Sequence, residues 1–264
     1  FMSSARIETL DTKLQTARSQ PLAAELARLD ARISADLRRR RVVAAEQAVP
    51  QAIALTDRLA TEFPRSRFVD GALRIKLSYI GLKRNELKTL QDETFDRLLP
   101  MVGVADRLMF ASEVPQGLYQ AIMNTNPSRN PGRTMPVDSV NWNDAEEFCT
   151  RLGWILGSRV RLPTLEEYRL AFGDDSGDVR SSAGEGKAGT TDGGRPNRNG
   201  YRDLIGNLAE WIAADAASDR APLAGGSYLD TPEALAKFIT ESRPKVDRAR
   251  HIGFRVVVEL AADR

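Results

Sequence analysis

Apolar side chains recur at intervals of three and four along the first part of the chain. The spacing of Ile7, Leu10 and Leu14 predicts an amphipathic helix. Pro21 should break or restart this helix, because proline cannot donate a backbone hydrogen bond. A similar apolar stripe follows it, formed by Leu22, Leu26, Leu29, Ile33 and Leu37. The pattern therefore predicts a helical start with a boundary at Pro21.

More helices are expected before residue 100. Pro50 marks a boundary, and a helix over 52–62 should end near Phe63-Pro64, since residues before proline avoid helical backbone angles. Ser66 is a candidate N-cap for a helix to about Lys83, and 85–99 reads as one more helix. We interpret 1–100 as a helical arm or small bundle. Its apolar stripes require a partner surface, either the second domain or another copy.

After residue 100 the periodicity becomes shorter and turn residues become frequent. Asn143 or Asp144 can cap a helix whose apolar face includes Cys149, which is best read as a small buried hydrophobic residue. Residues 159–164 read as a short strand, with Thr164 and Glu167 forming a capping box for the next helix. Residues 173–199 read as a long loop, and 252–258 as a continuous central strand. The pattern alone predicts a loop-rich α+β domain.

Composition excludes several classes of function. Hydrophobic residues make up 42% of the 264 positions and the net charge is only +2, which is ordinary for a globular protein and gives no reason to expect nucleic acid as partner. No apolar run is long enough to span a membrane. The basic run Arg38–Arg41 is read as a solvated helix face rather than a nucleic-acid or lipid patch. No signal peptide is visible, and a leader removed ahead of Phe1 stays open.

The stretch from Asp203 to Trp211 places two carboxylates, Asp203 and Glu210, on either side of a Gly206-Asn207 turn. Glycine and asparagine tolerate positive φ, so a tight turn is expected there. Such a turn can direct carbonyl oxygens toward the same point as the carboxylates, and Ca²⁺ takes six to eight oxygen ligands. The alternative is a turn whose acids only accept hydrogen bonds from nearby backbone groups.

Five short motifs follow one another along the second part of the chain: Pro136–Cys149, Arg161–Tyr168, Gly206–Trp211, Gly225–Tyr228 and Gly253–Arg255. In that order they resemble the formylglycine-generating-enzyme (sulfatase-modifying factor) family. The likeness runs from about Glu113 to Glu259, and it implies the C-type-lectin-like fold of that family for 101–264, preceded by the all-α region. Each motif is weak alone, and their order along the chain carries the resemblance.

The resemblance also implies a structural Ca²⁺ site in this domain. Its ligands would be the side chains of Asp203 and Glu210 and the backbone carbonyls of Gly206 and Leu208. The ion would tie together loops that few strand ladders hold. A second site of the family is expected within Gly173–Asn199, where no ligands can be aligned.

The chemistry of the family's oxidases is missing from this chain. Their copper-binding cysteine pair follows the Gly-Gly-Ser-Tyr block, and the matching positions here are Asp230 and Leu235. Cu(I) prefers soft thiolates, and Cys149 is the only cysteine. His251 is the only histidine, so it does not supply the three-histidine iron site of related sulfoxide synthases. We expect a pseudoenzyme that keeps the scaffold without the oxidation chemistry.

Other constellations support no enzyme class. Ser227 and His251 lack the surroundings of a hydrolase triad, and residues 184–189 lack the strand and helix that frame a phosphate loop. Four arginines lie close together near the end of the sequence: Arg243, Arg248, Arg250 and Arg255. Either they line what is left of the family's substrate groove, or they pair with acids on the surface, which is the interpretation that we favour.

Three hypotheses remain open. The first is a non-catalytic regulatory module that binds a protein or peptide, by analogy with bacterial relatives that activate threonine phosphorylation for type VI secretion. Its partner would be a membrane-bound kinase or the periplasmic sensor part of one, which favours a periplasmic over a cytoplasmic location. The second is an enzyme of unrecognised chemistry that uses acids such as Asp230. The third is a scaffold subunit that oligomerises through the helical arm.

Overall fold

A computed structural model of the chain describes residues 4–69, 84–184 and 187–260. The chain divides into two compact units, residues 1–91 with Trp154–Gly157 and residues 92–153 with 158–264. In the part that the structure describes, none of the helices combines the length and apolar character that crossing a bilayer requires.

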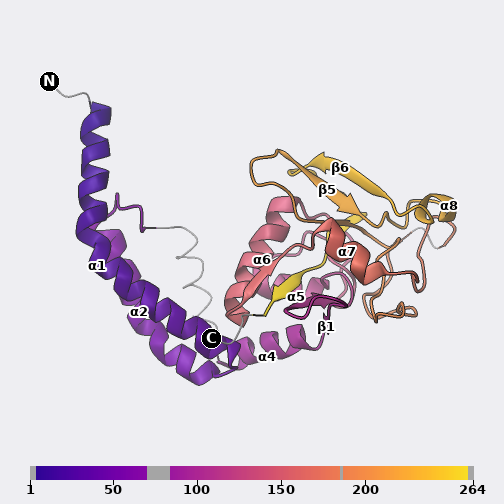
Figure 1. Cartoon of the computed structure of the whole chain (residues 1–264), viewed down its shortest axis with the longest axis horizontal. Coiled ribbons are helices and arrows are strands. Elements are labelled where there is room, and N and C mark those ends of the chain that lie inside the picture. Colours follow the sequence, from indigo (N-terminus) through magenta and orange to yellow (C-terminus); the bar gives the residue numbers. More distant parts are fainter. Residues whose placement is uncertain (1–3, 70–83, 185–186, 261–264) are drawn as a thin grey trace. The chain divides into compact units, whose positions relative to one another are not determined.

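The first unit is built on a hairpin of two long helices, α1 (Ser4–Arg38) and α2 (Val42–Glu62), shown in Figure 1. Arg40 makes the turn between them with a φ of 55°. The helices run antiparallel, because Arg65, just past α2, pairs with Asp11 near the start of α1. Their facing sides bury Leu26, Leu29, Ile33 and Leu37 of α1 and Val42, Ala45, Ala48, Val49, Ala52, Leu55 and Leu59 of α2.

Both predicted proline boundaries are wrong. Pro21 lies inside α1 and Pro50 lies inside α2. Each proline ring is exposed, whereas the opposite face of the same helix packs in the hairpin, so apolar packing outweighs the lost backbone hydrogen bond. The predicted end near Phe63-Pro64 is confirmed, and the expected helix after Ser66 lies mostly outside the described residues.

The next helix, α4 (Arg84–Phe95), is shorter than the sequence suggests. Its expected last turn instead forms β1 (Leu98–Pro100), which pairs antiparallel with β2 (Arg107–Phe110). The pairing places Leu99 opposite Met109, which is fully buried. A short strand therefore takes the place of the helix end because it has a partner strand that a local pattern does not reveal.

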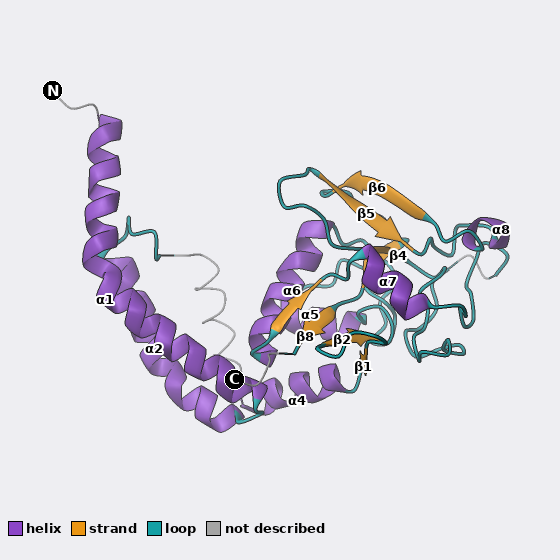
Figure 2. Ribbon diagram, viewed as in Figure 1, coloured by secondary structure: helices purple, strands orange, loops and turns teal. Residues whose placement is uncertain are grey.

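The second unit contains two four-stranded sheets among its described residues (Figure 2). The first has the order β1-β2-β8-β3 and is antiparallel throughout, with β3 at Arg159–Arg161 and β8 at Val257–Glu259. The second has the order β6-β5-β4-β7, and only its β4–β7 pair is parallel. Its strands are β4 (Ala209–Trp211), β5 (Arg220–Ala224), β6 (Thr240–Pro244) and β7 (Ile252–Phe254).

Four helices accompany these sheets: α5 (Gln116–Met123), α6 (Trp142–Leu156), α7 (Leu165–Phe172) and α8 (Pro232–Leu235). The capping box of Thr164 and Glu167 on α7 is confirmed. The predicted cap of α6 is wrong. Asn141 starts that helix, because its Oδ1 accepts from the Asp144 amide while Asp144 accepts from the Asn141 amide. The second unit thus combines α and β structure, and a helical region precedes it in the sequence, as expected.

The predicted continuous strand over 252–258 is two strands in different sheets. β7 ends at Phe254 as an edge strand, and β8 begins at Val257 as a central strand. Arg255 lies between them and is fully buried. A guanidinium in this position requires acidic and carbonyl partners, so the chain leaves one sheet and enters the other around that residue.

The only cysteine lies in the core of the second unit, as predicted. Cys149 is buried on α6, and burial raises the pKa of its thiol well above the ordinary value. Next to it along the helix, Phe148 stacks on Tyr119 and meets the ring of Phe254 edge-on. A neutral thiol in an aromatic core is a packing group rather than a reactive one.

Candidate functional site

The Asp203–Glu210 loop contains the tight turn that the sequence predicts. Gly206 and Asn207 both have positive φ, 78° and 55°. A side chain at position 206 would bring its Cβ to 2.1 Å from the Arg180 carbonyl oxygen, so only glycine fits. The backbone of the long loop therefore lies directly against the turn, and the Asn207 amide donates to the same Arg180 carbonyl at 3.0 Å.

Asn207 links this turn to two other segments. Its Nδ2 donates to Glu113 Oε1 at 2.8 Å, and its Oδ1 accepts from the Gly189 amide at 2.8 Å. Asn207 and Glu113 are both fully buried. The asparagine was expected only to favour the turn, and in the structure it also holds together parts of the chain that are far apart in sequence.

Glu210 forms a bidentate ion pair with Arg255. Arg255 Nη2 lies 2.6 Å from Glu210 Oε1, and Arg255 Nε lies 2.7 Å from Oε2. Both side chains are 0% exposed, and the Tyr168 hydroxyl donates to Oε1 at 3.1 Å. Burial raises the pKa of Glu210, and the charge of Arg255 opposes that shift. Burial lowers the pKa of Arg255, but Glu210 more than offsets this, so the guanidinium stays charged.

Asp203 has a different environment from Glu210, although the loop contains both. It is only 3% exposed, and its Oδ1 lies 3.5 Å from Arg180 Nε. Its Oδ2 has no hydrogen-bond partner among the described residues. Burial raises the pKa of Asp203 to about 6, against the opposing charges of Arg180 and Arg255. A buried carboxylate oxygen without a partner is rare and points to a group that the protein chain does not supply.

The predicted calcium ligands fit this geometry only in part. Asp203 suits a hard cation, and Gly206 and Leu208 stand on the same turn. Glu210 already has a counter-charge, because Arg255 binds both of its oxygens. Within the described ranges, no group of three or more His, Cys, Asp or Glu side chains is placed to hold a metal ion. Calcium binding by this loop stays a prediction.

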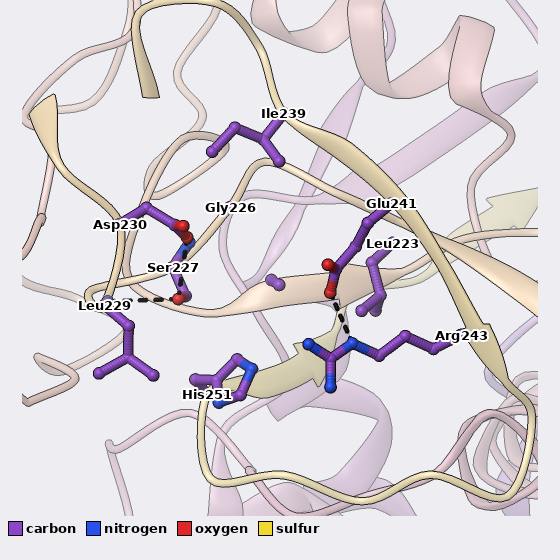
Figure 3. Close-up of a pocket in the computed structure, with 10 residues that line it drawn as sticks. Leu223, Gly226, Ser227, Leu229, Asp230, Ile239, Glu241, Arg243 and His251 are labelled. Atoms are coloured by element: carbon purple, nitrogen blue, oxygen red, sulfur yellow. Dashed lines mark hydrogen bonds and ion pairs between the residues drawn. The ribbon is translucent and has the colours of Figure 1, made fainter. Parts of the chain in front are cut away.

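A second candidate site is a pocket of about 280 Å³ next to the second sheet (Figure 3). Figure 3 shows Ser227 and Asp230 on one side, the Glu241–Arg243 pair on the other, and His251 near the base. Apolar side chains complete the wall, among them Leu223, Leu229 and Ile239. The pocket is close to the lower end of ligand cavities, roughly 300–1,000 Å³, and mixes apolar walls with a few polar groups.

Of the two positions at which the resemblance implies copper-binding cysteines, Asp230 lines this pocket, and Leu235 packs against Gly226, which also lines it. Asp230 Oδ2 accepts from the Ser227 amide at 2.8 Å and from its hydroxyl at 3.1 Å. Leu235 is buried, and a Cβ on Gly226 would lie 2.6 Å from its Cδ2. Asp230 therefore presents a carboxylate that hydrogen bonds fix in a turn, and Leu235 presents only methyl groups that pack on Gly226.

The pocket is not a hydrolase triad. The Ser227 hydroxyl donates to Asp230 and accepts from the Leu229 amide, so its proton is not directed toward His251. Burial lowers the pKa of His251, the charge of Arg243 lowers it further, and Glu241 and Asp230 partly compensate. The imidazole is consequently neutral at neutral pH, able to donate one hydrogen bond and accept another.

The late arginines divide between surface and core. Arg243 pairs with Glu241 at 2.6 Å and Arg248 with Asp144 at 2.6 Å, as surface pairing predicts. For Arg255 that interpretation is wrong, because its partner Glu210 is buried. In the described part of the long loop, between Gly173 and Asn199, Asp175 pairs with Arg195 at 3.1 Å. This pairing gives no ligand set for a second cation.

Sequence reasoning missed several residues of both sites. Glu113 was noticed only as the start of the family likeness, and Tyr168 only as a helix residue. The residues next to Glu113 in the sequence gave no signal that its carboxylate is buried. Leu223 and Ile239 come from segments that meet only through the pairing of β5 and β6, so no local pattern could have placed them in one pocket.

The fold and these sites together define a loop-rich α+β domain of the formylglycine-generating-enzyme type. A profile of the sulfatase-modifying factor enzyme 1-like domain matches residues 89–194 and 180–260. These matches span more than half of the sequence, and the chain belongs to that family. No curated protein matches the chain significantly.

Solved structures support the same fold. The Treponema denticola variable protein 1 is 24% identical, with a TM-score of 0.52 over 58% of this chain and 84% of that one. PvdO from Pseudomonas aeruginosa is 19% identical, with a TM-score of 0.51 over 58% of this chain and 80% of that one. CarF is 20% identical, with a TM-score of 0.50 over 59% and 87%. At these identities the likeness concerns the fold alone.

Proposed function

We propose that the protein is a non-catalytic regulatory module that binds a protein or peptide ligand at the Asp230 pocket. The observation that carries the proposal is the pocket's chemistry. Asp230 and Leu235 stand where the resemblance places two copper-binding cysteines, and the chain's single cysteine is buried on α6. Without paired thiolates the scaffold keeps a recognition surface and lacks a soft-metal site.

The lining of the pocket suits part of a peptide. The apolar groups Leu223 and Ile239 can contact a side chain, while His251 can donate or accept a hydrogen bond to a backbone group. The Glu241–Arg243 pair adds both signs of charge at the rim. A small cavity of this kind accepts one or two side chains and leaves the rest of a ligand on the surface.

The first test is an oxidation assay with a cysteine peptide, oxygen and added copper, beside a family oxidase as positive control. We expect no aldehyde product from this protein. Turnover above the copper-only background would contradict the proposal and support the alternative, an enzyme of unrecognised chemistry at Asp230. Asp230→Asn would then identify the carboxylate as the group responsible, if turnover disappeared.

The second test measures binding of peptides from an array, followed by fluorescence anisotropy on the best binder. Arg243→Ala should weaken binding about tenfold, because it removes one wall of the pocket. Arg220→Ala is the matched control, an exposed arginine on β5 that hydrogen-bonds Ser242. Equal affinity of both variants and the unaltered protein would place the ligand elsewhere.

We further propose that the Asp203 loop holds a structural Ca²⁺ ion. The support is the partnerless Oδ2 of Asp203, together with the carbonyls that the turn at Gly206 and Leu208 provides. When bound, the ion would supply positive charge and order to the turn, while Arg255 holds Glu210 independently.

By analogy with bacterial relatives, the partner would be a membrane-bound kinase or its periplasmic sensor part, in a TagR-like role that activates type VI secretion. This part of the proposal rests on architecture, and it predicts a periplasmic location. The test is direct binding between the full chain and a purified periplasmic kinase segment, with threonine phosphorylation as the readout. Binding without a change in threonine phosphorylation would contradict the proposal that the protein activates the kinase.

The alternative of an oligomeric scaffold rests on the exposed Ile7, Leu10 and Leu14 of α1. Light scattering of the full chain across a dilution series tests it. A constant monomer mass would remove this alternative, whereas a stable oligomer that loses mass in the Leu10→Glu variant would favour it.

A further inference from the structure

Three side chains of the Asp230 pocket project from one face of the second sheet. β5 and β6 pair antiparallel, and the register places Leu223 opposite Glu241. Alternate residues of a strand point to the same side, so Arg243 projects on that side as well. All three residues line the pocket. The sheet therefore places an aliphatic side chain, an acid and an arginine against one cavity.

Glu241 fixes the orientation of the Arg243 guanidinium. Arg243 Nε donates to Glu241 Oε1 at 2.6 Å. Figure 3 shows this bond at the Nε edge of the guanidinium, with the two Nη nitrogens on the side of His251. Among the described residues, Glu241 is the only hydrogen-bond partner of this guanidinium. Two N–H donors held in one plane match the two oxygens of a carboxylate.

Asp230 supplies an acceptor on the opposite side of the cavity (Figure 3). Its Oδ2 already accepts from the Ser227 amide at 2.8 Å and from the Ser227 hydroxyl at 3.1 Å. No lysine, arginine or histidine in the described part of the chain forms an ion pair with Asp230. Its Oδ1 is therefore the oxygen that remains for a donor on a ligand, such as a backbone N–H.

The charges around the pocket balance. His251 lies near the positive charges of Arg243 and Arg250. It also lies near the negative charges of Glu241 and Asp230. With two charges of each sign, the positions of the donors and acceptors, and not an overall field, determine which group of a ligand binds where.

We propose that the Asp230 pocket binds the carboxyl-terminal residue of a peptide. The terminal carboxylate lies against the Nη nitrogens of Arg243, and the backbone N–H of the same residue donates to Asp230. Its aliphatic side chain packs on Leu223 and Ile239. The inference rests on the proposed peptide binding at this pocket and specifies which part of the peptide enters. A cavity of about 280 Å³ suits one terminal residue rather than a stretch of chain.

A chain end satisfies these groups better than an internal acidic side chain. In a terminal residue, the carboxylate, the N–H and the side chain are all attached to one carbon atom. One residue thus contacts Arg243, Asp230 and the apolar wall together, and little of the rest of the peptide has to be ordered. An internal aspartate or glutamate brings a carboxylate without an aliphatic group. It is the competing source of the same charge, and the experiment separates the two.

The test titrates the full chain with small compounds that represent peptide ends, followed by NMR chemical shifts. N-acetyl-leucine carries the carboxylate, the N–H and the aliphatic side chain, and should bind with a dissociation constant of about 1 mM, as its size allows. N-acetyl-leucine amide lacks the carboxylate and should bind about tenfold more weakly. N-acetyl-glycine lacks the aliphatic side chain and should also bind more weakly than N-acetyl-leucine.

Arg243→Lys tests the paired donors directly. Lysine keeps the positive charge and loses the planar fork, so N-acetyl-leucine should lose about fivefold in affinity while its amide does not change. Arg220→Lys is the matched control, an exposed arginine of β5 that hydrogen-bonds Ser242 and does not line the pocket. It should leave both affinities unchanged. The comparison of acid and amide in the unaltered protein requires no variant to fold.

Four outcomes would overturn the inference. Equal binding of N-acetyl-leucine and its amide would remove carboxylate recognition and leave peptide binding at the pocket intact. Tighter binding of N-acetyl-glutamic acid α-amide would assign the pocket to an internal acidic side chain. Tighter binding of free leucine would assign it to free amino acids. If none of these compounds binds, the inference fails, and peptides from the array that still bind would show that the proposed function survives without it.

Discussion

The helical hairpin and the loop-rich second unit bury different kinds of side chain. Between α1 and α2, the buried positions are mostly Leu, Ile, Val and Ala, repeated along two regular faces. In the second unit, the buried set includes Glu113, Asp203, Glu210 and Arg255 beside aromatic rings. Both regions exclude water from their interiors. The hairpin buries one acid, Asp36, which pairs with the exposed Arg41, whereas the second unit buries several acids together with an arginine.

The contrast shows how each region is held in one arrangement. A helix satisfies its own backbone, so the hairpin needs only complementary apolar faces. The second unit consists largely of loops, whose buried backbone groups need partners from elsewhere in the chain. Arg255 and Asn207 provide such partners, because each binds a segment distant in sequence. The buried polar groups thus determine where the loops lie.

The largest expected effect comes from breaking the buried ion pair. Arg255→Met should lower the free energy of unfolding of the second unit by about 3–5 kcal/mol, because Glu210 would stay buried without its counter-charge. Urea denaturation followed by the fluorescence of Trp142 and Trp211 measures the change. Arg248→Met, which removes a half-exposed pair with Asp144, should cost less than about 1 kcal/mol. Equal losses in the two variants would show that burial of an ion pair does not determine how much its arginine stabilises the second unit.

A truncation in the hairpin should have the next largest effect. Leu59 is 1% exposed, and Leu59→Ala should destabilise the helical unit by about 2–4 kcal/mol through lost apolar contact and a residual cavity. Far-ultraviolet circular dichroism during urea denaturation reports on it. Ile53→Ala, at a position 39% exposed on the same helix, should cost well under half as much. A similar loss at both positions would mean that the hairpin is not organised by its buried face.

The third effect concerns pH and the carboxylate of Glu167. Burial alone would raise its pKa, but hydrogen bonds from Arg161, the Thr164 amide and Arg107 lower it from 4.5 to about 2. A lowered pKa stabilises the folded state above the unfolded value, so this contribution is present above about pH 4.5 and disappears as the pH falls toward 2. It amounts to roughly 3 kcal/mol.

Glu167→Gln tests that sign, because it removes the titrating group and keeps the size of the side chain. Urea denaturation of both proteins should show a difference in stability at neutral pH that shrinks as the pH falls below about 4.5. A difference that stays constant down to pH 2 would show that the ionised carboxylate does not stabilise the fold.

The smallest expected effect is at the N-cap of α7. The Thr164 hydroxyl accepts from the Glu167 amide at 3.2 Å, and Thr164→Ala should cost about 1 kcal/mol. Thr164→Ser keeps the hydroxyl and should recover most of that loss in the same denaturation assay. If serine and alanine behaved alike, the stabilisation would come from the threonine methyl group and not from capping.

Prediction from sequence succeeded where a rule acts over a few residues. The capping box at Thr164 and the Gly206-Asn207 turn depend on chemistry within one turn of chain, and both are present. It failed where distant packing competes with a local rule. Pro21 and Pro50 stay inside helices because the opposite faces pack, and residues 252–258 split because Arg255 has a buried partner.

The candidate sites show the same limit. Asp203 was predicted as a cation ligand from the turn beside it, and in the structure its Oδ2 is buried without a hydrogen-bond partner among the described residues. Glu210 was chosen by the same reasoning, yet an arginine forty-five residues later takes both of its oxygens. Glu113 escaped notice because it is ninety-four residues from Asn207, the side chain that binds it.

The sequence by itself determined the family, the helical character of the first part and the absence of paired thiolates, because motifs, periodicity and residue counts need no knowledge of space. The tertiary structure alone decided which buried acid meets an arginine and which keeps a partnerless oxygen. It also decided which apolar and polar groups share the Asp230 pocket. The physical reason is that a buried charge or polar atom is defined by what surrounds it, and those surroundings come from segments that only folding brings together.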